Sequence, residues 1–359
     1  MNLAPKMSFS PWIEIDTRAL RHNLGVVRDH APGAGIMAVI KANAYGHGVQ
    51  VAASALEEAD SFAVARVEEG LELRRAGVEK PVLVLAGAHD ALELEAAAAA
   101  GLDLVVHHAF QLALLRETPL PSPVAVWLKV DTGMNRLGVK PGEVPGVLQT
   151  LKSLAKVRGC LTHLANADDL GDDFTRVQVQ RFHTAVGHTG LPLSIANSAG
   201  ILGWPESHAD WVRPGIMLYG ASPFAAPVDV LQPVMTFASR LISVKKVRAG
   251  EPVGYGGLWQ APRDSIIGVV AAGYADGYPR EMPGGAPVLV NGLIAPLVGR
   301  VSMDTLMVDL TEQPEACPGD PVILWGRGLP AETIAGAAQT IPYTLFCGIG
   351  GRVRRKVLT

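Results

Sequence analysis

The sequence predicts an α/β protein, in which a (β/α)8 TIM-type barrel is followed by a mostly antiparallel β domain. Three observations support this fold class. The chain has 359 residues, 48% of them hydrophobic, so it can bury the cores of two domains. Up to about Gly220, short apolar runs rich in β-branched residues alternate with helical patterns in eight units, as in a closed parallel barrel. Beyond about Leu231, strand patterns follow one another with only turn residues between them.

Each expected barrel strand is a short apolar run. The eight runs are residues 36–40, 62–65, 82–85, 104–106, 124–130, 157–161, 193–196 and 211–212. Helical patterns lie between them, as at residues 51–59, 67–76, 91–100 and 178–187. The alanine-rich stretches 96–100 and 331–338 fall in helical contexts, so they are ordinary helix formers.

The second domain is expected to contain strands at residues 240–247, 266–272, 288–290, 306–310 and 322–324. These patterns divide the chain into an N-terminal extension (1–10) that joins the C-terminal domain, a barrel (11–230) and a β domain (231–359).

Composition excludes several classes of protein. The net charge is −3 and the basic residues form no run, which argues against a nucleic-acid partner. No apolar stretch reaches the roughly 20 residues that a membrane-spanning helix needs, and the first ten residues lack the pattern of a signal peptide. Three dispersed cysteines form neither a disulfide framework nor a metal site. A protein of the reducing cytoplasm is expected.

Polar residues follow five of the expected barrel strands, at the end where such barrels place their active sites. They are residues 41–46, 129–136, His163, Asn197 with Ser198, and 213–215. The sequence therefore predicts one ring of chemistry at the carboxyl ends of the strands.

Lys41 is the first candidate for chemistry, because it follows the apolar run 36–40 and its amine would emerge at the mouth of the barrel. Partial burial lowers the pKa of a lysine and frees the amine to form a Schiff base. The alternative is a lysine that extends from a strand end into solvent.

Lys41 lies in the first of five segments that are considered together. They are VIKANAYGHG (39–48), WLKVDTGMNRLG (127–138), RPGIMLYG (213–220), GYADG (273–277) and VGRVSMD (298–304). Together they resemble the motifs of alanine racemases, in the same order and over nearly the whole chain. That family combines a barrel with a β domain, which agrees with the fold expected from periodicity.

The resemblance implies that Lys41 carries pyridoxal phosphate as an internal aldimine and is one of two acid/base groups. The other is Tyr255 in the segment PVGYGG (252–257), hydrogen-bonded by His163 and Arg280. Two groups are needed because a proton leaves one face of the α-carbon and another arrives on the opposite face. Taken alone, Tyr255 would be a packing residue in a glycine-rich turn, since an unassisted phenol is a poor base.

The resemblance also assigns the contacts of the cofactor. Arg213 faces the pyridine nitrogen, although a structural salt bridge is the alternative for this residue. The phosphate is held by Tyr45, Ser198 and the backbone N–H groups of Gly215 and Ile216. Gly351 stands where the family often has a further phosphate-binding tyrosine, which puts the cofactor affinity in doubt.

Arg136 is expected at the phenolic oxygen of the cofactor and the substrate carboxylate, with the backbone of Met303 from a partner chain. Lys129 supports Arg136, either carbamylated as in related enzymes or unmodified and paired with Asp131; Asn197 is a further supporting residue. Asp276 and Asp304 are expected to make structural hydrogen bonds. His47 has no second ligand at a suitable spacing, so no metal is expected.

The implied function is interconversion of L-alanine and D-alanine by a homodimer with shared active sites, supplying D-alanine for peptidoglycan. The nearest alternative is a racemase of the same fold that prefers serine or a broader set of amino acids. A fold-related decarboxylase would need a strong electron sink, which Arg213 opposes. A pyridoxal-phosphate homeostasis protein would lack the second domain that carries Tyr255.

Overall fold

The computed structural model describes residues 9–359, which form two compact units. One is Leu20–Leu218, and the other joins the described residues up to Ala19 to Tyr219–Thr359. Most of the expected extension, residues 1–10, lies outside the described part of the chain. No helix in residues 9–359 is long and apolar enough to cross a membrane.

The first unit contains a closed barrel of parallel strands, which confirms the expected fold. The strands pair in sequence order, and β9 pairs with β2 to close the ring. They are β2 (Gly35–Val39), β3 (Ser61–Val64), β4 (Val82–Val84), β5 (Asp103–Val106), β6 (Ala125–Lys129), β7 (Lys156–Leu161), β8 (Leu193–Ser194) and β9 (Trp211–Val212). All eight lie where apolar runs were expected, because strands buried on both faces are continuously hydrophobic.

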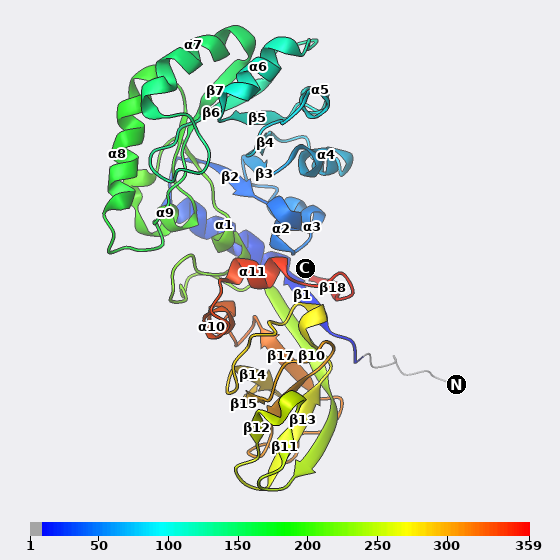
Figure 1. Ribbon diagram of the computed structural model, residues 1–359. Helices are drawn as coiled ribbons and strands as arrows, with labels where there is room; N and C mark the ends of the chain where they lie inside the picture. Colours follow the sequence, from blue (N-terminus) through cyan, green and yellow to red (C-terminus); the bar gives the residue numbers. More distant parts are fainter. Residues whose placement is uncertain (1–8) are drawn as a thin grey trace. The chain divides into compact units, whose positions relative to one another are not determined.

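Helices alternate with these strands, and Figure 1 shows α4 to α8 outside the ring. The unit contains α2 (Lys41–Tyr45), α3 (Val49–Ala55), α4 (Val67–Arg75), α5 (Ala91–Ala99), α6 (Ala109–Glu117), α7 (Val144–Leu154), α8 (Phe174–Val186) and α9 (Ser198–Gly203); α1 (Thr17–His30) precedes them. The helix expected at 51–59 ends at Ala55, because Ala59 N–H donates to the Leu56 carbonyl in a turn that leads into β3.

The second unit is a mostly antiparallel sheet in the order β13-β16-β15-β14-β17-β10-β1-β18, with a further pairing of β10 and β13. Its strands are β1 (Trp12–Asp16), β10 (Met235–Val247), β13 (Ser265–Val270), β14 (Pro287–Val290), β15 (Leu293–Val298), β16 (Leu306–Asp309), β17 (Pro321–Trp325) and β18 (Arg354–Leu358), with the short pair β11 (Pro252–Val253) and β12 (Trp259–Gln260). The helices α10 (Ala331–Ala337) and α11 (Pro342–Cys347) complete it (Figure 1). Among the described residues of this sheet, only β1 and β18 pair in parallel.

The division between the units differs from the expected boundaries at 11 and 231. Strand β1 pairs with β10 and β18, so residues 12–16 belong to the β unit and not to the barrel. Ile13 and Ile15 are fully buried there. The pairing partner of β1 lies far along the chain, and no local pattern identifies it.

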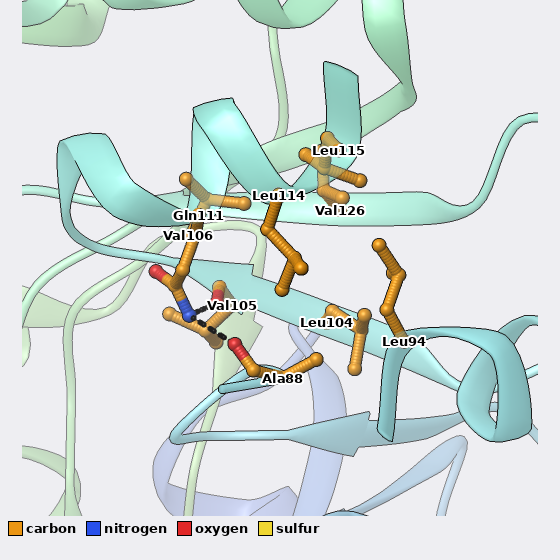
Figure 2. A pocket seen from close by; sticks show the side chains of 9 residues that line it. All are labelled: Ala88, Leu94, Leu104, Val105, Val106, Gln111, Leu114, Leu115 and Val126. Atoms are coloured by element: carbon orange, nitrogen blue, oxygen red, sulfur yellow. Dashed lines mark hydrogen bonds between the residues drawn. The ribbon is translucent and has the colours of Figure 1, made fainter. Parts of the chain in front are cut away.

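A buried glutamine holds the barrel wall between β4 and β5 (Figure 2). Gln111 of α6 is 3% exposed, and its Nε2 lies 3.3 Å from the carbonyl oxygens of Ala86, Ala88 and Val105. Its Oε1 accepts the N–H of His107 at 2.8 Å. The adjacent apolar cavity has a volume of about 10 Å³, near the lower limit for one water.

We therefore expect Gln111→Ala to lower the free energy of unfolding by about 2–4 kcal/mol, because several buried backbone groups lose their partner. Urea denaturation followed by tryptophan fluorescence measures this change. The exposed Gln149 of α7 supplies the control Gln149→Ala. Equal stability losses in the two variants would contradict the role of Gln111.

Candidate functional site

The chemistry-bearing residues of the barrel follow the carboxyl ends of its strands. Lys41 follows β2, Lys129 ends β6, His163 follows β7 and Arg213 follows β9. Parallel strands present these ends on one rim. The cations at 41, 129, 136 and 213 all contribute to lowering the pKa of His163, so the structure brings these predicted residues into one electrostatic neighbourhood.

The segment after Lys41 is a left-handed turn. The φ angles of Ala42, Asn43, Ala44 and Tyr45 are 52°, 52°, 53° and 52°. Left-handed helical backbone costs on the order of 1–2 kcal/mol per non-glycine residue. Backbone hydrogen bonds within the turn partly offset this cost, such as that from Gly46 N–H to the Ala42 carbonyl at 3.0 Å. Such strain persists only where its surroundings enforce it.

Tyr45, Ser198 and Gly215, predicted to bind phosphate, lie close together. Ser198 Oγ accepts the N–H groups of Gly215 at 2.9 Å and Met217 at 3.3 Å. A Cβ at Gly215 would lie 2.7 Å from the hydroxyl oxygen of Tyr45, so only glycine keeps this space open. Ile216 begins the 3-10 turn Ile216–Tyr219.

Asn197 precedes the same cluster of side chains. Its side-chain oxygen accepts the N–H of Gly200 at 2.9 Å and thereby caps α9. It therefore fixes the helix on which Ser198 stands.

Arg213 is almost fully buried, yet its partners are neutral. Its guanidinium donates to Ser194 Oγ and to the carbonyl oxygens of Thr162 and Ile195, the last at 3.2 Å. No carboxylate pairs with it among residues 9–359, so the salt-bridge interpretation is wrong there. Burial lowers the pKa of Arg213 to about 10, which leaves it charged at neutral pH.

A chain of buried hydroxyl groups fixes the side chain of Thr162, the residue whose carbonyl Arg213 contacts. Thr162 Oγ1 donates to the Val130 carbonyl at 2.8 Å and lies 2.9 Å from Thr132 Oγ1. Thr162 has one hydroxyl proton, so Thr132 must donate to Thr162. The side-chain amide of Gln178 donates to Thr132 at 3.1 Å and to the His163 carbonyl at 3.1 Å.

The pKa values of Lys129 and His163, two titratable groups at the rim, are both lowered, which favours their neutral forms. Burial, followed by the nearby charges of Arg213, Arg136 and Lys41, lowers the pKa of Lys129 to about 8. Burial, with Arg213 as the next cause, lowers the pKa of His163 well below its ordinary value. His163 is therefore a neutral imidazole at pH 7.

The Asp131 carboxylate organises the loop that carries Arg136. It accepts the N–H groups of Gly133 at 3.1 Å and Asn135 at 3.0 Å, and the ammonium of Lys140 at 2.6 Å. Burial raises the pKa of Asp131, but these hydrogen bonds outweigh burial and lower it overall. In residues 9–359 no hydrogen bond joins Asp131 to Lys129.

The predicted residues of the β unit are exposed. Tyr255 is 71% exposed and begins the 3-10 turn Tyr255–Gly257 between β11 and β12. Arg280 lines a cleft of about 360 Å³ with Leu258 and Trp259 of the same loop region. Met303 is 53% exposed, and its carbonyl accepts the N–H of Ala275 at 3.0 Å.

Asp276 and Asp304 make the structural bonds expected of them. Arg352 Nε donates to Asp276 at 2.7 Å, and its Nη2 donates to Asp304 at 2.6 Å. These contacts join the C-terminal segment to the loop of Met303. Asp276 is buried and also accepts the N–H of Gly273 at 2.9 Å.

Comparison with known proteins identifies the family. Residues 15–223 match the family model "Alanine racemase, N-terminal domain", and residues 234–357 match "Alanine racemase, C-terminal domain". The chain belongs to the alanine racemase family.

Individual relatives in this family span nearly the whole chain. An alanine racemase of Actinobacillus succinogenes is 49% identical over 346 residues, which cover 95% of this chain and 97% of that protein. The biosynthetic alanine racemase of Pseudomonas aeruginosa has a similar crystal structure, with a TM-score of 0.94, 42% identity, and coverage of 98% and 100%. An alanine racemase structure from Bartonella henselae, described as having covalently bound pyridoxal phosphate, has a TM-score of 0.89, 31% identity, and coverage of 97% and 99%.

Several residues of this alanine racemase family member were not found by sequence reasoning. Thr162, Gln178 and Ser194 support Arg213 and His163. Thr162 and Gln178 do so through backbone carbonyls and Ser194 through its hydroxyl, and the three form no spaced motif. At the position of the missing tyrosine, a Cβ on Gly351 would meet open space, so packing does not require glycine there.

We expect the Lys129 amine to titrate near pH 8, because burial and neighbouring cations disfavour its charged form. Its neutral, reactive fraction should rise as the pH rises through about 8. Competitive labelling with acetic anhydride and peptide mapping measures this rise, with the exposed Lys152 as a reference for reagent stability. Labelling that begins only above about pH 10, as for an ordinary lysine, would contradict the lowered pKa.

Proposed function

We propose that this chain is a pyridoxal-phosphate-dependent alanine racemase that interconverts L-alanine and D-alanine by two-base proton transfer. The observation that carries the proposal is the set of residues at the carboxyl ends of the barrel strands. There, Lys41 precedes a strained turn, Gly215 leaves space beside the Tyr45 hydroxyl, and Arg213 is a buried cation, in a chain of the alanine racemase family. We also propose that this activity supplies D-alanine for peptidoglycan within the cytoplasm.

The barrel residues fit pyridoxal phosphate. The space that a Cβ at Gly215 would fill lies beside the hydroxyl of Tyr45, and Ser198 Oγ lies 2.9 Å from the Gly215 nitrogen, so hydroxyl groups suited to a phosphate gather at this turn. Arg213 has five N–H bonds, of which three meet neutral acceptors. The remaining donors have no partner among residues 9–359 and suit an aromatic nitrogen acceptor.

Pyridoxal phosphate, when bound, supplies a carbonyl carbon that links to an amine and a ring that accepts electron density from the substrate α-carbon. Arg213 sets how strong that ring is as an acceptor. Its guanidinium stays charged at neutral pH, so it would donate to the ring nitrogen and would keep a proton away from it. A weaker acceptor favours return of a proton to the α-carbon over transamination.

Lys41 and Tyr255 hold the two protons in the proposed reaction. One group removes the proton from one face of the α-carbon, and the other donates a proton to the opposite face. The roles exchange with the direction of the reaction. The neutral His163 and the cationic Arg280 assist by hydrogen bonding to the tyrosine oxygen, because a donor beside a phenolate stabilises it.

Arg136 binds the substrate carboxylate through a planar guanidinium, with a backbone group of Met303 from the partner chain. We propose that Lys129 is carbamylated and orients Arg136. Its neutral amine can add carbon dioxide, forming an N–C bond and releasing a proton. The lowered pKa of Lys129 supports this modification, and Asp131 already bonds Lys140.

The decisive experiment is incubation of the purified protein with L-alanine in deuterated water. We expect optical rotation to be lost while deuterium enters the α-position of both enantiomers, because protons exchange on both faces. The Lys41→Ala variant should lose both effects together with the visible absorption of the bound cofactor. Retention of absorption or exchange in that variant would refute the assignment of Lys41.

We further propose a homodimer in which each active site takes Lys41 from one chain and Tyr255 from the other. Lys41→Ala and Tyr255→Phe homodimers should each be nearly inactive, whereas a mixed dimer has one intact site. Complete random exchange makes about half of the dimers mixed, so activity should return to roughly a quarter of the wild-type level.

Subunit exchange is confirmed by mass spectrometry of the intact dimers. A mixture of the Lys41→Ala dimer with itself, treated identically, is the control. If exchange is complete and no activity returns, both residues act within one chain and the shared-site model is wrong.

A further inference from the structure

The carboxylate of Glu69 connects the left-handed turn that follows Lys41 to strand β3 and helix α4. Glu69 is the third residue of α4 and is only partly exposed. Its Oε2 accepts the N–H groups of Ala65 at 2.7 Å and Arg66 at 3.1 Å, just beyond the end of β3. Its Oε1 accepts the N–H of Ala42 at 2.6 Å. The first two bonds cap the helix, while the third reaches another element.

The third bond, from the N–H of Ala42, lies at the start of the left-handed segment. Ala42 directly follows Lys41 and is the first of the four left-handed residues. The hydrogen bond holds the Lys41–Ala42 peptide in its present orientation at the point where the left-handed residues begin. A hydrogen bond to a charged acceptor is stronger than a neutral one, so Glu69 favours the strained conformation.

The far end of the turn is held by a different side chain. Asn43 Oδ1 accepts the N–H of Val49 at 2.8 Å, and the Asn43 carbonyl accepts the N–H of Gly48 at 3.0 Å. These bonds tie the turn to α3. Glu69 therefore fixes the end that carries Lys41, and Asn43 fixes the end beyond Tyr45.

We infer that Glu69 is a positioning residue that sets the orientation of Lys41 by holding the left-handed turn. Lys41 and Tyr45 are four residues apart, so the same turn also sets the orientation of the Tyr45 hydroxyl relative to the lysine. Relaxation of the turn would move both groups together. This inference rests on the proposed function only in that Lys41 binds the cofactor.

The experiment compares four holoenzymes: the wild type, Glu69→Gln, Glu68→Gln, and Glu69→Gln combined with Ala42→Gly. Glutamine has the size of glutamate but only one acceptor oxygen and no charge. Glu68 is exposed on the same helix turn and makes no bond to Ala42, so Glu68→Gln is the matched control. Ala42→Gly removes the steric cost of the left-handed conformation at the residue where Glu69 acts.

The first readout is the rate at which hydroxylamine removes the cofactor, followed by loss of its absorption. We expect Glu69→Gln to lose the cofactor about tenfold to a hundredfold faster than the wild type, the range for lost hydrogen bonds to a charged group. Glu68→Gln should match the wild type, and the double variant should recover part of the difference. We expect kcat to fall and KM to change little, since the substrate-binding Arg136 lies on another loop.

The second readout is hydrogen exchange of the amides at residues 42–46. It should accelerate in Glu69→Gln without a matching fall in the thermal midpoint of the barrel. Equal cofactor-loss rates with unchanged exchange would overturn the inference, as would a double variant that recovers nothing. If Glu69→Gln does not fold, Glu69→Asp, which keeps the charge but shortens the reach to Ala42, takes its place. A wild type that holds no cofactor would refute the proposed function, and the exchange measurement would still decide the role of Glu69.

Discussion

Closure of the barrel by β9 and β2 is the constraint on which the rim depends. Gly35 pairs with Trp211 and Ile36 with Val212, and Val39 N–H donates to the Pro214 carbonyl at 2.9 Å, farther toward the carboxyl ends. A Cβ at Gly35 would lie 2.6 Å from the ring of Trp211, so this closure requires glycine. Because these two strands are neighbours, the residues that follow them, including Lys41 and Arg213, share one side of the rim.

Burial and positive charge together set the protonation of the titratable groups at the rim. Burial is the larger cause of the lowered pKa values of Lys129 and His163, and the charges of Lys41, Arg136 and Arg213 lower both further. Because arginine resists deprotonation, Lys129 and His163 are the groups whose pKa falls, and they become neutral more readily. A surplus of buried cations is costly unless an anion compensates for it. The same electrostatics therefore favour both anionic occupants of the rim and a reactive amine at Lys129.

Sequence reasoning located the strands and the residues at their ends because both leave local signals. A barrel strand is a continuous apolar run, and the polar residue that ends it is conspicuous, as Lys41 is after 36–40. The membership of β1 in the β unit left no such signal, since its pairing with β10 joins distant segments. Glu69 and Gln178 were missed because they bond to backbone amides and carbonyls, which every residue has.

The left-handed turn could not be predicted because residues 42–45 carry no local signal for positive φ. Sequence analysis associates positive φ with glycine, but residues 42–45 contain none, and the turn is built from alanine, asparagine and tyrosine. Glycine would remove the strain, whereas residues with a Cβ favour right-handed backbone. External bonds must therefore select the left-handed conformation at these positions. The chain thus accepts local strain after Lys41 in exchange for a single orientation, provided that the carboxylate of Glu69 and the amide of Asn43 hold the two ends.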